Sequence, residues 1–144
     1  MRSIHIGSDH AGYDLKQYIG NELAGMNYKI IDHGANSGKS CDYALIAQPL
    51  CRAVLDTGST GILICGTGLG MSMAANRFHG IRAAKCNLEI EARLARRHNN
   101  ANILCLGARM LGTELAIAIT LAFLDSAFEN GRHQRRIDQL EQIA

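Results

Sequence analysis

The strongest constraint on the fold is a regular alternation of short apolar runs with longer amphipathic segments. The short runs have the length and composition of buried strands, and they span residues 3–7, 29–32, 61–65, 82–85 and 103–106. The segments between them have helical length or spacing, and they span residues 12–24, 42–55, 70–77, 88–98 and 112–128. A last helix is expected over residues 131–143. The sequence therefore predicts five βα units and a tail helix.

This order favours parallel strands, because a parallel connection needs a crossover of about a dozen residues. We expect an α/β fold, a Rossmann-like three-layer αβα sandwich whose five-stranded parallel sheet runs 2-1-3-4-5, plus a C-terminal helix. In that order the carboxyl ends of the first and third strands lie side by side, where ligands bind in such sheets. Asp9, His10 and Cys65 would then meet at this edge.

Composition narrows the possible classes of protein. The 144 residues suit a single domain, 1–144, and the 47% hydrophobic and 19% charged content is typical of a globular chain. A net charge of +2 does not indicate a nucleic-acid partner. The longest nearly apolar run, 115–124, is about half of a bilayer crossing, and the amino terminus carries no hydrophobic signal segment. We expect a cytoplasmic protein without a nucleic-acid or membrane partner.

The cysteines form an odd set of five without a CxxC pair or a short Cys/His spacing. This pattern argues against a disulfide framework and a structural zinc site. We interpret them as reduced thiols: Cys41, Cys51, Cys65, Cys86 and Cys105.

The segment from Leu115 reads LAIAITLAFL and is apolar on every helical face. A helix on the outside of a single domain normally keeps a polar stripe, so a large subunit interface is predicted here. Alternatively, later segments of the same chain cover both faces.

The first candidate motif is 7–12, GSDHAG, which lies between a strand and a helix. Such a turn directs Asp9 and His10 into the ligand crevice. Asp9 could instead be only a helix N-cap, and His10 a surface imidazole.

The second candidate motif is the glycine-rich segment 61–72, in which a buried strand ends at Cys65. Successive backbone amides at a helix N-terminus stabilise an anion, and the same field favours a thiolate, so Cys65 could act as a base. The alternative is a small buried hydrophobic residue at a strand end. The loop lacks a Gly-Lys-Ser/Thr ending and GxGxxG spacing, so nucleotide binding becomes the second choice.

Two basic segments complete the candidates. His98 closes a helix, where the negative dipole end favours its protonated form and suits a proton donor, although a capping imidazole is the alternative. Arg132 and Arg136 share a face of the tail helix, and Arg109 follows the fifth strand. Forked guanidinium groups suit phosphate, although a basic helix is more often a solvated face.

Together these segments resemble the sugar-phosphate isomerase family that contains type B ribose-5-phosphate isomerases and the galactose-6-phosphate isomerase subunits. The resemblance spans nearly the whole chain and is carried, in order, by GSDHAGYDLK, GILICGTGLGMSMAANR, GIRAA, RRHNNANILCLGAR and GRHQRR.

The resemblance implies an aldose-ketose isomerase of the pentose phosphate pathway that interconverts ribose 5-phosphate and ribulose 5-phosphate. It implies no metal and no cofactor, and a homodimer or homotetramer whose active sites are shared between subunits. By resemblance, Cys65 moves the proton between C2 and C1, Thr67 steadies the charged oxygen, and Asp9 and His98 attend ring opening. His98, Asn99 and Arg109 would come from the partner subunit. The implied substrate-binding residues are His10, Tyr43, Gly66, Gly68, Gly70, Asn99, Arg109, Arg132 and Arg136.

The sequence departs from the family pattern where Ala44 follows Tyr43 in place of a proline. The only proline of the chain is Pro49, which inside a helix would cost about 3 kcal/mol. We therefore expect a kink or a non-helical first turn there, which leaves the position of Tyr43 open.

The sequence is also compatible with two other functions. One is an isomerase of a six-carbon substrate, such as allose 6-phosphate or galactose 6-phosphate, because the sequence does not give the pocket depth. The other is a non-catalytic module that binds a nucleotide or a sugar phosphate in the same crevice.

Overall fold

The computed structural model describes residues 1–143 and confirms the α/β sandwich. The strands are β1 (Ser3–Ser8), β2 (Lys29–Asp32), β3 (Thr60–Cys65), β4 (Ala83–Lys85) and β5 (Ile103–Gly107). A 3₁₀ turn, η1 (His10–Gly12), precedes the first of six α-helices. The helices are α1 (Tyr13–Gly25), α2 (Tyr43–Thr57), α3 (Leu69–Ala75), α4 (Glu89–Asn99), α5 (Thr113–Asp125) and α6 (Arg132–Glu141).

All strand pairs are parallel, and the sheet order is β2-β1-β3-β5-β4. The predicted order 2-1-3-4-5 is therefore wrong in its last two places. The physical reason is burial: β5 is buried along its whole length and lies inside the sheet, whereas the three residues of β4 are only half-buried and form an edge.

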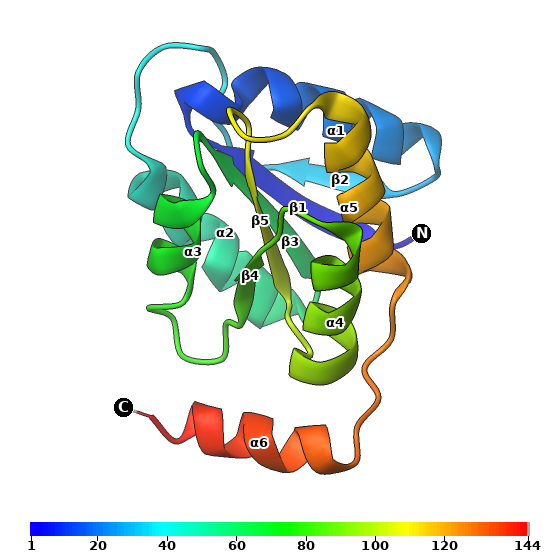
Figure 1. Ribbon diagram of the computed structural model, residues 1–144. Coiled ribbons are helices and arrows are strands. Elements are labelled where there is room, and N and C mark those ends of the chain that lie inside the picture. The colour runs from blue at the N-terminus through cyan, green and yellow to red at the C-terminus, as the bar shows by residue number, and fades with distance from the viewer. Residues whose placement is uncertain (144) are drawn as a thin grey trace.

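Side chains alternate between the two faces of the sheet, as the period of a strand requires. Ile62 and Ile64 pack with α1, α4 and α5, whereas Leu63 and Cys65 pack with α2 and α3. Figure 1 shows these two helical layers on either side of the sheet, with α6 below them, where it contacts the end of α4.

Helix α2 begins at Tyr43 and continues through Pro49, so the non-helical first turn is wrong, whereas the alternative expectation of a kink stays a prediction. Proline removes the hydrogen bond to the carbonyl four residues earlier, that of Leu45. Leu45 is exposed, so water can satisfy this carbonyl and the helix tolerates the loss.

Helix α5 packs against α1 and α4, and its inner residues, such as Ile119 and Phe123, are fully buried. Ile117 and Leu121 stay half-buried, so a subunit interface here remains a prediction. Among residues 1–143, no helix combines the length and the apolar content needed to cross a membrane.

Candidate functional site

The carboxyl ends of β1 and β3 bring Asp9 close to the strand that carries Cys65. The amide of Asp9 donates to the Ile64 carbonyl at 3.1 Å. Asp9 Oδ1 accepts hydrogen bonds from the amides of Ala11 and Gly12 at 3.0 and 3.2 Å, so this carboxylate does cap the turn η1. The predicted meeting of Asp9 and the end of β3 is confirmed.

His10 follows Asp9 and lies against the loop before α2. Its Nδ1 is 3.2 Å from both the amide nitrogen and the carbonyl oxygen of Cys41. These two contacts fix the imidazole at the edge of the sheet, beside the carboxyl end of β1.

Cys65 is the last residue of β3, and its side chain is buried beneath the glycine-rich loop. Its Sγ accepts a hydrogen bond from the amide of Gly68 at 3.2 Å. The sulfur therefore has one backbone donor, and Cys65 also belongs to the buried apolar cluster that contains Leu63 and Met71. Gly68 itself has φ +82°, a conformation that favours glycine, at the point where the loop turns into α3.

The loop after β3 fits closely against its neighbours, and this contact positions Tyr43 and Thr67. A Cβ on Gly70 would lie 2.8 Å from the Tyr43 ring, so the first residue of α2 covers the start of α3. A Cβ on Gly107 would lie 2.6 Å from the Thr67 backbone, so the end of β5 supports the loop. The structure therefore places Tyr43 at the rim of the loop after β3, although the next residue is Ala44 and not a proline.

Arg109 lies beside the same loop. Its amide donates to the Gly66 carbonyl at 2.9 Å, and a Cβ on Gly66 would lie 3.0 Å from the Arg109 guanidinium. The expectation that Arg109 reaches the site from a partner subunit is therefore corrected. Arg109 and Cys65 of one chain lie at the same end of the sheet because β3 and β5 are neighbours. The predicted strand order placed β4 between these two strands.

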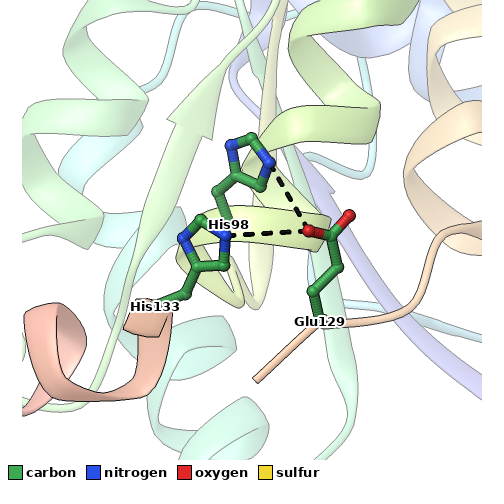
Figure 2. Close-up of side chains that lie close together, drawn as sticks. All are labelled: His98, Glu129 and His133. Atoms are coloured by element: carbon green, nitrogen blue, oxygen red, sulfur yellow. Dashed lines mark ion pairs between the residues drawn. The ribbon is translucent and has the colours of Figure 1, made fainter. Parts of the chain in front are cut away.

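A second group of predicted residues gathers at the end of α4 and the start of α6 (Figure 2). The Nε2 atoms of His98 and His133 lie 3.7 and 3.6 Å from the same oxygen of Glu129. The two imidazole rings stack with centroids 4.3 Å apart and an interplanar angle of 11°. This cluster holds His98 between two helices, with Glu129 in the segment that precedes α6.

Glu129 and His133 differ in their favoured charge state. A hydrogen bond from Arg97 lowers the pKa of Glu129, so this group is a carboxylate near neutral pH. Burial, together with Arg132, lowers the pKa of His133 and favours its neutral form. Sequence reasoning missed Glu129 and gave His133 no role, although His133 lies within the GRHQRR motif that pointed to Arg132 and Arg136.

The three ligand atoms of this cluster lie within 4.8 Å of one another, which raises the question of a metal ion. A metal binds imidazole along the nitrogen lone pair, in the plane of the ring. Because the rings of His98 and His133 are stacked almost in parallel, one ion cannot lie in both planes. The arrangement favours an ion-pair cluster over a metal site.

The remaining predicted residues lie near this cluster, on helices α4 and α6. Asn99 is exposed at the last turn of α4, and Arg132 and Arg136 are exposed on α6. Both arginines lie close enough to His133 to affect its titration. The second group of predicted residues is therefore His98, Asn99, Arg132 and Arg136.

Within one chain the two groups lie at opposite ends of the sheet. Cys65 pairs with Gly107 at the carboxyl end, whereas Gly61 pairs with Ile103 just after the turn from α4. Four residues at about 3.3 Å each separate these ends by about 13 Å. His98 and Asn99 therefore do not reach Cys65 of their own chain.

Three further cysteines are buried packing residues. Burial raises the pKa of Cys51 to about 11 and that of Cys86 to about 12, and it raises the pKa of Cys105 well above its ordinary value. These thiols stay protonated near neutral pH, so they do not offer an anionic sulfur.

Comparison with known proteins gives consistent matches along the chain. The family model described as Ribose/Galactose Isomerase matches residues 4–140. Ribose-5-phosphate isomerase B of Escherichia coli K12 is 42% identical over 99% of this chain and 97% of its own length. D-erythrulose-4-phosphate isomerase of Pectobacterium atrosepticum is 40% identical over 97% of this chain and 93% of its own length.

Solved structures agree with these matches. A ribose 5-phosphate isomerase from Thermotoga maritima superposes with a TM-score of 0.97 at 48% identity, covering 99% of both chains. Ribose-5-phosphate isomerase B from Mycoplasma genitalium with bound ribulose-5-phosphate superposes with a TM-score of 0.94 at 42% identity, covering 97% of this chain and 94% of that one. The fold, the motifs and these matches together establish that the chain belongs to the ribose/galactose isomerase family.

Proposed function

We propose that this protein interconverts ribose 5-phosphate and ribulose 5-phosphate, with Cys65 as the base. The observation that carries the proposal is the position of the Cys65 sulfur, which lies under the Gly68 amide at the edge that also holds Asp9, His10 and Arg109. Family membership and the ribulose-5-phosphate bound by the Mycoplasma genitalium relative support the same assignment.

The chemistry requires one proton to move between adjacent carbons. The Cys65 thiolate takes the proton from C2 of the open-chain aldose, the electron pair forms the C1–C2 double bond, and the C1 carbonyl oxygen becomes the enediolate oxygen. The O2 hydroxyl proton then moves to O1, and the thiol returns its proton to C1 to give the ketose. The C2 proton is only weakly acidic, so preorganised donors must stabilise the enediolate. Thr67 and the amide of Gly66 are donors close to the sulfur along the chain, whereas the Gly68 amide is already bonded to the sulfur itself.

We infer that the active site is shared between two subunits. His98 and Asn99 lie about 13 Å along the sheet from the Cys65 edge of their own chain, so a symmetric partner must bring its own copies to this edge. In this arrangement His98 of the partner subunit protonates the ring oxygen, and Asp9 takes the proton from the O1 hydroxyl as the ring opens. A homodimer and a homotetramer built from such dimers would both contain this shared site.

The phosphate group would bind to cationic donors from both subunits. His10 and Arg109 lie at the Cys65 edge, and Arg132 and Arg136 would extend from helix α6 of the partner. Because the phosphate does not react, its binding energy serves to position C2 against the sulfur. No metal is needed for enolisation when an oriented base and such donors are present. The proposed setting is the pentose phosphate pathway in the cytoplasm.

The number of carbon atoms in the sugar phosphate substrate has an alternative. The family model includes galactose in its description, and the Pectobacterium atrosepticum relative is named for a four-carbon sugar phosphate. A six-carbon substrate, such as allose 6-phosphate or galactose 6-phosphate, would need a longer distance between the sulfur and the arginines of α6.

The test is a coupled assay of ketose formation from ribose 5-phosphate. Cys65→Ala should remove turnover, whereas the matched change Cys41→Ala should keep it, because Cys41 contacts His10 only through its backbone. In deuterated water the product should carry deuterium at C1 to the extent that the Cys65 thiol exchanges with solvent before it returns the proton, whereas a hydride shift would leave no deuterium there. Turnover that survives Cys65→Ala rejects the base, and a higher kcat/KM for a six-carbon substrate rejects the named sugar. Stabilisation by nucleotide without turnover would favour the binding module.

A further inference from the structure

A polar cavity of about 460 Å³ lies at the amino-terminal edge of the sheet, away from the Cys65 loop. Its walls come from the residues just before β1, β3 and β5 and from α4. None of the residues assigned to the isomerase site lines it, so the inference below does not depend on the proposed function. Three arginines, Arg2, Arg82 and Arg96, converge on this cavity from separate segments.

The positive charges of the cavity are only partly compensated. Arg82 pairs with Glu141, but Arg2 and Arg96 bind only neutral acceptors within residues 1–143. Arg2 donates to the Leu124 carbonyl at 2.7 Å, and Arg96 donates to the Ala101 carbonyl at 2.6 Å. No carboxylate lines the cavity in the described part of the chain.

Keeping the three guanidinium groups together carries an energetic cost. The pKa of Arg96 is lowered mainly by burial, and in second place by the charges of Arg2 and Arg82. Its Nε is buried and has no hydrogen-bond acceptor in the chain as described. This Nε is closed off from the cavity, but the repulsion among the three like charges around it favours the arrival of an anion.

The end of helix α4 offers an internal explanation for part of this cluster. Arg82 and Arg96 both bind carbonyls in the turn after α4, where the helix dipole supplies about half a negative charge. Together with Glu141, this dipole offsets about one and a half of the three positive charges. About one and a half positive charges therefore remain around the cavity.

We propose that this cavity is a second binding site, which takes the phosphate group of inorganic phosphate or of a small phosphate ester. Guanidinium forks match phosphate oxygens in geometry and charge. Ser59 and Thr60 add hydroxyl groups to the walls, which suit a hydrated anion or the hydroxyls of a sugar. The side-chain amide of Asn102 is already bonded to the Arg82 amide and the Gly80 carbonyl, so it serves to hold the wall in place. The cavity is large enough for either ligand.

The experiment is an amide NMR titration of the intact protein with inorganic phosphate, and with ribose 5-phosphate in parallel. Residue-resolved signals separate this cavity from the Cys65 loop. We expect saturable shifts at Ser59 and Asn102 with phosphate, and not with chloride at equal ionic strength. Shifts with both phosphate compounds mean that the phosphate group suffices, whereas shifts with the ester alone identify an ester as the ligand.

Variants link the shifts to the arginines. Arg96→Gln should raise the Kd measured at Ser59 by at least about tenfold, because a charged hydrogen bond is lost. Arg2→Gln should also raise this Kd. Because Arg2 lies outside α4, this variant leaves the helix unchanged and serves as the second test if Arg96→Gln does not fold. Arg93→Gln is the matched control, since Arg93 is on the same helix but pairs with Glu89 outside the cavity. Absence of saturable shifts in the wild type, shifts reproduced by chloride, or an unchanged Kd in both variants overturns the proposal.

Discussion

Two inactive variants of this chain should restore activity when their subunits are mixed. Cys65→Ala removes the proposed base from one end of the sheet, and His98→Gln removes the proposed proton donor from the other. In one chain His98 lies beyond the opposite end of the strand that carries Cys65, and the paired part of that strand is about 13 Å long. A complete site in a mixed dimer therefore combines Cys65 of one subunit with His98 of the other.

The size of the recovery follows from counting sites. Free exchange of equal amounts gives half mixed dimers, and each mixed dimer holds one complete site, so about a quarter of wild-type activity should return. The assay is ketose formation from ribose 5-phosphate after exchange, with mixed dimers verified by native mass spectrometry. Each parent variant assayed alone supplies the baseline.

A matched pair provides the control. Arg109 lies beside Gly66 on the same edge as Cys65, so mixing Cys65→Ala with Arg109→Gln leaves every site with one lesion. This mixture should stay at the baseline. If the first mixture also stays there although mixed dimers are present, each chain works alone and the shared site is refuted.

Three further predictions concern other parts of the fold. Gly107→Ala should lower the free energy of unfolding by about 1–3 kcal/mol and reduce kcat/KM, because its Cβ would lie 2.6 Å from the backbone of the loop after β3. Gly38→Ala, whose Cβ would meet nothing within 4 Å in an exposed loop, should change stability by less than about 0.5 kcal/mol, and equal urea midpoints for the two variants would contradict the packing argument. Burial lowers the pKa of His5 and His33, so the unfolded state gains protons first and the free energy of unfolding should fall as pH drops below about 6.5; urea midpoints that stay level or rise on acidification would reject this reasoning. Glu129→Gln should lower kcat about tenfold with little change in KM, since it removes the charge that faces the proposed proton donor; steady-state kinetics that show only a KM effect would assign Glu129 to substrate binding instead.

The sequence predicted the layers of the fold well because strand and helix periodicity are local properties. It did not predict that β5 lies inside β4, since strand order depends on contacts between distant segments. A signal was nevertheless present: residues 103–106 are entirely apolar, whereas residues 82–85 begin with Arg82 and end with Lys85. Charged ends on a short strand are typical of a sheet edge.

The candidate site was predictable where its residues follow a strand. Asp9 and Cys65 were placed together because β1 and β3 are adjacent, and the pairing is confirmed. Arg109 was assigned to the wrong subunit, because its proximity to Gly66 depends on β3 and β5 being neighbours. The contact of Glu129 with His98 joins an irregular segment to a helix end, and no periodic pattern encodes such a contact.

The position of His10 gives its ring a property that most surface histidines lack. In one tautomer of the imidazole Nδ1 accepts the Cys41 amide, and in the other the same atom donates to the Cys41 carbonyl at the same 3.2 Å. In both cases the heavy atoms need not move. The ring can therefore turn its Nε2 from a hydrogen-bond donor into an acceptor while it keeps one orientation beside the carboxyl end of β1.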